Sequence, residues 1–213
     1  PTPTDDNGSE IAARLAGKLP AWEALDLVPS EAIPPGNKTS EPLRYGHKMW
    51  RDLFSPRQLL GHATAVEVFR TLLEDRERER ALTDVTRAAF AYLALSLDKM
   101  LNYNSRMSVW MSTREVVANT FNRHDFAFAW SHAEMPPLIA GRGYEWAFEQ
   151  TAKCIEELVE LTHPGVDVKA SSRGAAGAGL FDAVGFVPPP VTVTCRSADA
   201  LTHLGEASVD AEI

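Results

Sequence analysis

The sequence predicts a mainly α fold, in which a long helical region is followed by a short strand–helix–strand segment. Apolar residues recur at three- and four-residue steps from about residue 47 to residue 162, which is the period of amphipathic helices. The last stretch places the β-branched run "VTVTC" before "SADALTHL" and "ASVDAEI". This order predicts a parallel βαβ fragment of a Rossmann-like sheet, whose other strands would be supplied by polypeptide outside this sequence.

Residues 1–40 are predicted to form an N-terminal helix followed by a linker. Ser9 is expected to cap a helix that breaks near Gly17 and Pro20, because both residue types weaken a helix interior. The turn-rich stretch "PSEAIPPGNKTSEP" then connects this helix to the next region.

Residues 41–163 are predicted to form a helical domain that contains a helix pair. Ser55 is a natural N-cap and Pro56 suits the first helical position. The face of this first helix is formed by Leu59, Leu60, Ala63, Val66, Phe69 and Leu73. The stretch "ALTDVTRAAFAYLALSLDKMLNYN" predicts the second helix of the pair, with one apolar stripe along its length.

Shorter elements are predicted after the helix pair. Ser112 and Glu115 have capping-box spacing, which predicts that a short helix begins there. "HDFAFAW" alternates in the manner of an extended segment, and "YEWAFEQTAKCIEELVEL" predicts a final helix. Residues 164–190 are rich in small residues and Pro, which predicts a flexible linker before the strand–helix–strand fragment at 191–213.

Composition restricts the classes of function. The net charge of −8 argues against a whole surface built to bind nucleic acid, because non-specific affinity comes from Lys and Arg that neutralise phosphates. The sequence has no apolar run of membrane-spanning length and no secretory signal pattern, so we expect a cytoplasmic protein that does not enter a membrane. Two cysteines are too few for a disulfide framework or a four-cysteine zinc site.

One segment concentrates positive charge. "RYGHKMWRDLFSPRQ" carries Arg44, Lys48, Arg51 and Arg57, interleaved with aromatic residues. Two interpretations stay open: a solvated helix face beside an aromatic core contact, or a local patch that binds nucleic acid.

Four blocks of the sequence resemble a known family. "YGHKMWRDLFSPRQLLGHATAVEVF", "YLALSLDKMLNYNSRMSVW", "TFNRHDFAFAWSHAEM" and "GYEWAFEQTAKCIEEL" are similar to the middle section of the large bacterial and archaeal adenine-specific DNA methylases. Members of that family carry an N-terminal domain of unassigned function and often a zinc ribbon. The resemblance covers roughly residues 30–213 and depends on the order of the blocks rather than on a single motif.

The resemblance implies an activity and a place within it. Such enzymes transfer a methyl group from S-adenosylmethionine to the amino nitrogen of a flipped adenine. In the family, the segment similar to residues 191–213 runs directly into the catalytic Asp-Pro-Pro-Tyr motif, which this sequence does not contain. We therefore expect a fragment that is inactive alone, needs the remaining methyltransferase or a complementary subunit, and contributes a helical insertion that shapes the DNA-binding cleft.

Candidate site residues follow from these interpretations. The resemblance places Ser197 and Asp199 near the cofactor adenine, although a helix N-cap and first turn explain them equally well. "GAAGAG", residues 174–179, does not lie between a convincing strand and helix, so it does not predict a cofactor loop. The candidates for DNA contact are Arg44, Lys48, Arg51, Arg57, Tyr103, Asn104, Arg106 and Arg123.

Each DNA candidate has a competing interpretation. An Arg or Lys can be a surface charge or half of an ion pair, and Tyr103 with Asn104 can simply end a helix. His124, Asp125, His132 and Glu134 fit no metal-ligand spacing, and His62 is expected to pack in a helix face, so neither a metal site nor a catalytic residue is predicted. The alternative function is a non-catalytic helical interaction module, or a split subunit that binds a protein partner.

Overall fold

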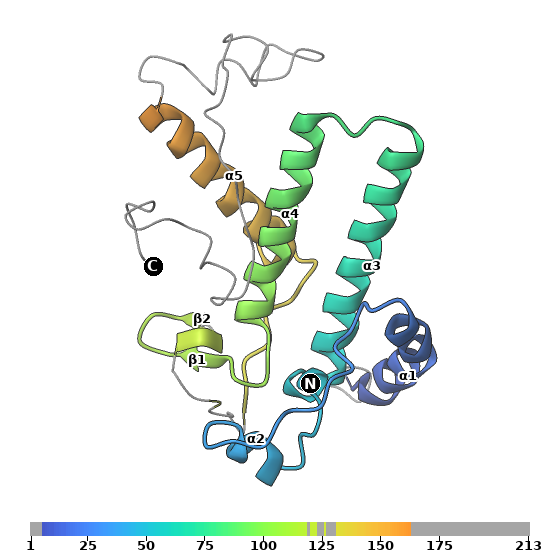
Figure 1. Ribbon diagram of the computed structural model, residues 1–213. Helices are drawn as coiled ribbons and strands as arrows, with labels where there is room; N and C mark the ends of the chain where they lie inside the picture. Colours follow the sequence, from blue (N-terminus) through green and yellow to red (C-terminus); the bar gives the residue numbers. More distant parts are fainter. Residues whose placement is uncertain (1–5, 119, 123–125, 127–130, 163–213) are drawn as a thin grey trace, which may run out of the picture. The chain divides into compact units, whose positions relative to one another are not determined.

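The computed structural model describes residues 6–118, 120–122, 126 and 131–162. The chain divides into two compact units, Pro1–Leu158 and Val159–Ile213, and the description below concerns the first. Within the described residues the fold is mainly α, as the sequence predicts (Figure 1). The predicted linker at 164–190 and the βαβ fragment at 191–213, including Ser197 and Asp199, lie outside the described residues.

The order of elements is simple. The helices and strands are α1 (Gly8–Ala24), α2 (Ser40–Arg44), the 3-10 helix η2 (Trp50–Leu53), α3 (Pro56–Arg78), α4 (Asp84–Tyr103), β1 (Val109–Met111), β2 (Val116–Ala118), the 3-10 helix η3 (Thr120–Asn122) and α5 (Gly143–Thr162). Helix α5 starts in the first unit and ends in the second.

Helix α1 runs without a break, although Pro20 lies inside it. The predicted break near Gly17 and Pro20 is therefore wrong, and so is Ser9 as the cap, because the N-cap is Asn7 and makes no side-chain capping bond. Burial of an apolar face outweighs the local cost of the proline. Helix α1 packs on α3, and the core between them contains Trp22, Val28, Leu59 and Ala63, with Leu15, Leu19, Leu27, Phe54 and Leu60 against it.

The start of α3 confirms the predicted cap. The Ser55 hydroxyl oxygen accepts a hydrogen bond from the Gln58 backbone N–H at 3.2 Å, and the Gln58 side-chain oxygen accepts one from the Ser55 N–H at 2.8 Å. Pro56 occupies the first helical position, where its missing N–H costs nothing.

The predicted helix pair is confirmed by α3 and α4, which lie side by side and antiparallel in Figure 1. The Phe69 and Phe90 rings meet edge to face, with centroids 5.5 Å apart. Thr83 caps α4 by accepting from the Thr86 N–H at 3.2 Å. This hairpin therefore has a defined start and an aromatic contact that joins its two helices.

A β-hairpin replaces the short helix predicted from Ser112. Strands β1 and β2 pair antiparallel, with Val109 opposite Ala118. Glu115 has a left-handed φ of 51°, which suits a turn and not the first turn of a helix. The prediction was wrong because the β-branched Val116 and Val117 favour a strand over the helix that the capping-box spacing indicated.

Helix α5 confirms the predicted final helix and packs on α4. The Tyr103 and Trp146 rings meet edge to face with centroids 5.2 Å apart, and the Ser96 hydroxyl donates to the Thr151 hydroxyl oxygen at 2.8 Å. Of the predicted extended segment "HDFAFAW", only Phe126 is among the described residues.

Candidate functional site

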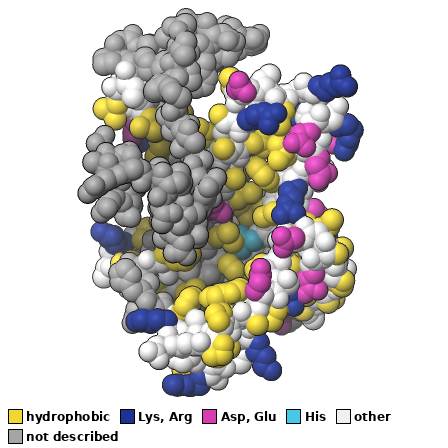
Figure 2. Space-filling view, viewed as in Figure 1, with side chains coloured by type: hydrophobic (Ala, Val, Ile, Leu, Met, Phe, Trp, Pro, Cys, Tyr) yellow, Lys and Arg dark blue, Asp and Glu magenta, His cyan; other side chains and the backbone are white. Residues whose placement is uncertain are grey.

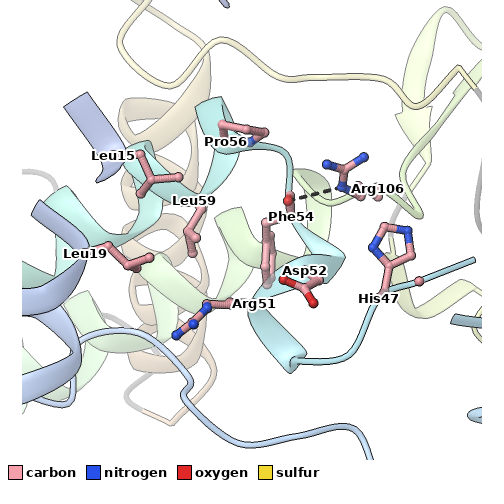
Figure 3. A pocket seen from close by; sticks show the side chains of 10 residues that line it. Leu15, Leu19, His47, Arg51, Asp52, Phe54, Pro56, Leu59 and Arg106 are labelled. Atoms are coloured by element: carbon pink, nitrogen blue, oxygen red, sulfur yellow. Dashed lines mark hydrogen bonds between the residues drawn. The ribbon is translucent and has the colours of Figure 1, made fainter. Parts of the chain in front are cut away.

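A pocket of about 380 Å³ lies where α1, η2, the start of α3 and the residues after α4 meet. Its lining residues are Leu15, Leu19, Gly46, His47, Arg51, Asp52, Phe54, Pro56, Leu59 and Arg106. Figure 3 shows the leucines of α1 on one side and Arg106 with His47 on the other. The pocket thus has one apolar wall and one charged wall.

Two of its charges are already used within the protein. The Asp52 carboxylate accepts hydrogen bonds from the backbone N–H groups of Lys48 and Met49, both at 2.8 Å. Arg51 forms an ion pair with Glu23 of α1. Both interactions fix the η2 turn against its neighbours; Glu23 offsets the charge of Arg51, whereas Asp52 keeps its negative charge.

Hydrogen bonds to backbone carbonyl oxygens fix Arg106, but among the described residues no carboxylate neutralises its charge. Its Nε donates to the Phe54 carbonyl oxygen at 3.2 Å, and its backbone N–H donates to the Leu53 carbonyl oxygen at 2.9 Å. Among the described residues, no carboxylate forms an ion pair with it. Burial, together with the positive charge of Arg106, lowers the pKa of His47, so the guanidinium is the dominant positive group on this wall.

Arg44 and Lys48 add positive charge close in sequence to this wall. Both side chains are exposed, and in the described part of the chain neither forms an ion pair. Gly46 and His47, which line the pocket, lie between them in the sequence. Figure 2 shows Lys and Arg side chains along the end of the described unit where Figure 1 places α2, with most acidic side chains farther along the molecule.

The other predicted DNA contacts have different surroundings. Arg57 donates to the Asn7 side-chain oxygen at 2.9 Å and approaches Glu134 at 3.6 Å. Tyr103 is half-buried against Trp146, and Asn104 is 5% exposed. The structure thus places Arg51 and Arg106 on one pocket, with Arg44 and Lys48 exposed on either side of its residues Gly46 and His47 in the sequence. Tyr103 is half-buried and Asn104 is buried, and Arg123 lies outside the described residues.

A second pocket, of about 220 Å³, lies beside His62 of α3. His62 Nε2 is 2.9 Å from the Asn104 backbone carbonyl oxygen, and Nδ1 is 3.2 Å from the Tyr144 hydroxyl. Burial lowers the pKa of His62 and raises that of Tyr144 to about 12. Both side chains are therefore neutral near pH 7.

Further polar side chains enclose this pocket. The Asn104 side-chain oxygen accepts from Gln58 Nε2 at 3.4 Å and from the Met135 N–H at 3.1 Å. The Ser55 hydroxyl donates to the Glu134 carboxylate at 2.5 Å. The sequence predicts that His62 packs in a helix face, and the structure adds that it lines a polar pocket. The sequence pattern that could have indicated this pocket is the spacing of Gln58 and His62, which lie one turn apart on an otherwise apolar face.

The described residues do not fit a bound S-adenosylmethionine or a metal. Their one sheet is the two-stranded antiparallel hairpin, and no glycine-rich loop joins a strand to a helix within them. His132 Nε2 and Glu134 Oε1 are 3.6 Å apart, while His124 and Asp125 lie outside the described residues. We therefore assign no cofactor contact and no reaction step to this part of the chain.

Comparison of the chain with protein-family models, with curated proteins and with solved structures finds no match. Within the described residues, no helix combines the length and the apolar character that crossing a membrane requires.

Proposed function

We propose that this chain is part of a cytoplasmic, S-adenosylmethionine-dependent, adenine-specific DNA methyltransferase, and that its helical unit contacts the DNA backbone. The observation that carries the DNA contact is the edge formed by Arg44, Lys48 and Arg106, defined here as the basic edge. These three cations have no ion-pair partner among the described residues, although the chain has 29 acidic residues against 21 Lys and Arg.

Cations without an ion-pair partner favour DNA binding because of the way in which proteins gain affinity for the DNA backbone. Each Lys or Arg that meets a phosphate releases a condensed counterion, and this release favours binding. A cation that already faces a carboxylate gains less, because it must share or break that pair. Arg51, paired with Glu23, therefore contributes less than Arg106, which meets only a carbonyl oxygen.

The chemistry of methyl transfer belongs to the rest of the enzyme in this proposal. Flipping and holding an adenine needs an aromatic platform and acceptors for its amino group, which the resemblance assigns to the Asp-Pro-Pro-Tyr motif. The helical unit supplies binding and orientation of the duplex. The chain alone is accordingly proposed to bind DNA weakly and to transfer no methyl group.

Fluorescence anisotropy with a labelled DNA duplex tests the DNA contact. The Arg44→Ala/Lys48→Ala variant of the 213-residue chain should bind at least about tenfold more weakly than the parent. The matched control is Arg80→Ala/Arg87→Ala, which removes the same charge from the connection between α3 and α4 and the first turn of α4. Equal losses in the two variants would show that only net charge matters and would remove the assignment of the basic edge.

A second function is favoured by a different observation. Apolar side chains on α3 and α4 are exposed, among them Leu72 at 50% and Leu95 at 58% (Figure 2). Such a surface is typical of protein interfaces, which suits a non-catalytic interaction module or a complementary subunit. This function predicts that the parent chain associates with a protein partner in sedimentation velocity, and that Leu72→Glu/Leu95→Glu abolishes this association. It also predicts that the parent chain has no affinity for DNA.

A further inference from the structure

We propose that the pocket beside His62 is a binding site for a small, neutral, planar molecule that carries a primary carboxamide. This site is distinct from the basic edge and does not depend on the proposed DNA contact. Its volume of about 220 Å³ is far more than a single water needs and is below the range of pockets for drug-sized ligands, so it suits a fragment-sized molecule.

The hydrogen bonds of His62 define what the Tyr144 hydroxyl can do. The Asn104 carbonyl oxygen is only an acceptor, so His62 Nε2 carries the proton and donates to it. In a neutral imidazole the other nitrogen, Nδ1, is then an acceptor. The Tyr144 O–H therefore donates to Nδ1, and the free lone pair of the phenolic oxygen can accept a hydrogen bond from a ligand.

The Asn104 side chain supplies the complementary donor. Its amide oxygen is identified by the two donors that it accepts from, Gln58 Nε2 and the Met135 N–H. The amide nitrogen then makes no hydrogen bond to any described residue, although Asn104 is 5% exposed and lines the pocket. This N–H₂ group, which has no partner among the described residues, is available to donate to the carbonyl oxygen of a ligand.

The lining of the pocket thus includes both hydrogen-bond donors and acceptors. A primary carboxamide presents a carbonyl oxygen for Asn104 Nδ2 and an N–H₂ group for the Tyr144 oxygen and the Glu134 carboxylate. Pro136 and Pro137 provide an apolar wall for the rest of a planar ligand. A carboxylate of the same shape lacks the donor and would face the Tyr144 lone pair. Arg57 also lines the pocket, but it is paired with Glu134 at 3.6 Å, so the two charges together offer no net positive charge for an anion.

The pocket can be closed without touching its polar groups. Gly61 lines it, and a Cβ added there would lie 4.0 Å from Pro137 Cγ, an ordinary contact distance. A leucine at this position would extend into the cavity. Gly17 of α1 is an exposed helical glycine with open space around it, so Gly17→Leu is a matched control with the same change in helix propensity.

Titration of the 213-residue chain with benzamide, followed by ligand-observed NMR, tests the proposal. Benzamide should bind with a dissociation constant on the order of 1 mM, and benzoate at least about tenfold more weakly. Gly61→Leu should abolish benzamide binding, whereas Gly17→Leu should leave it unchanged. Tyr144→Phe, which removes the acceptor oxygen, should weaken benzamide binding while leaving the pocket open.

Three results would overturn the proposal. The first is the absence of benzamide binding to the parent chain at concentrations well above the millimolar range. The second is benzoate binding as tightly as benzamide, which needs no variant and stands even if Gly61→Leu does not fold. The third is equal binding by the Gly61→Leu and Gly17→Leu variants, which would place the ligand elsewhere.

Discussion

Replacing Ser55 with alanine should destabilise the protein by about 2 to 3 kcal/mol. Loss of the N-cap bond to the Gln58 N–H costs about 1 kcal/mol. Loss of the hydrogen bond to the Glu134 carboxylate adds about 1.5 kcal/mol, the lower end for a charged acceptor. We take the lower end because the Glu134 side chain is 28% exposed, so water can solvate part of the carboxylate once the hydroxyl is gone.

The matched control is Thr83→Ala at the start of α4. Thr83 also caps a long helix, by accepting from the Thr86 N–H, but among the described residues it bonds to no distant carboxylate. Its loss should cost about 1 kcal/mol. The measurement is the free energy of unfolding in urea, followed by circular dichroism, for both variants under the same conditions.

A double-mutant cycle isolates the bond between Ser55 and Glu134. Ser55→Ala and Glu134→Ala should show a coupling free energy of about 1 kcal/mol, because each single change removes the same interaction. Suppose that Ser55→Ala costs no more than Thr83→Ala and that the cycle shows no coupling. The hydrogen bond between Ser55 and Glu134, which are 79 residues apart in the sequence, would then not stabilise the fold.

The remaining predictions use other parts of the same unit. Gly143→Ala should lower the free energy of unfolding by at least about 3 kcal/mol, because φ is +61° and a Cβ would lie 2.2 Å from the Pro137 carbonyl oxygen. Gly141→Ala, where φ is +69° but the space is open, should lower it by only about 1 to 2 kcal/mol. Thermal or urea unfolding measures both. Since burial depresses the pKa of His62 below its ordinary 6.5, the unfolded chain binds the proton more readily; stability should therefore fall as the pH decreases through about 6.5. His62→Gln should flatten that pH dependence more than His47→Gln, which replaces the less buried histidine; equal slopes would contradict this assignment.

The sequence predicted the elements whose local and tertiary signals agree. The start of α3 carried both a capping box at Ser55 and an apolar stripe, and the structure has the helix there. The same holds for α4 and for α5, where the helical period continues over many residues. Such helices can be predicted from the sequence because the helix cap, the period of the apolar residues and the tertiary packing all favour the same structure.

The errors arose where a short local signal opposed a longer-range one. Pro20 indicated a break, but burial of Trp22 at 1% exposure against α3 keeps α1 continuous. The spacing of Ser112 and Glu115 indicated a cap, but the adjacent valines pair as a strand. The first outcome cannot be derived from a window of a few residues, because its deciding contacts come from α3, whereas the second depends on pairing with Val109–Met111 only a few residues earlier.

The candidate sites show the same limit. Charge clustering indicated Arg44, Lys48, Arg51 and Arg57 as a group, but only the fold shows that Arg51 is paired with Glu23 and Arg57 with Glu134, and that Arg106 lines the same pocket as Arg51. The pocket beside His62 depends on Tyr144, which lies 82 residues away in the sequence. No spacing rule links such positions, because loop and helix packing bring them together.

The salt dependence of DNA binding is the sharpest test of the DNA contact proposed for the basic edge, because it counts the phosphates that the protein neutralises. For the Arg44→Ala/Lys48→Ala/Arg106→Gln variant, the slope of log K against log salt concentration should be shallower than that of the parent chain by about 2.7, roughly 0.9 for each cation removed. A slope that equals that of the parent chain, or no measurable DNA binding by the parent at low salt, would contradict the account.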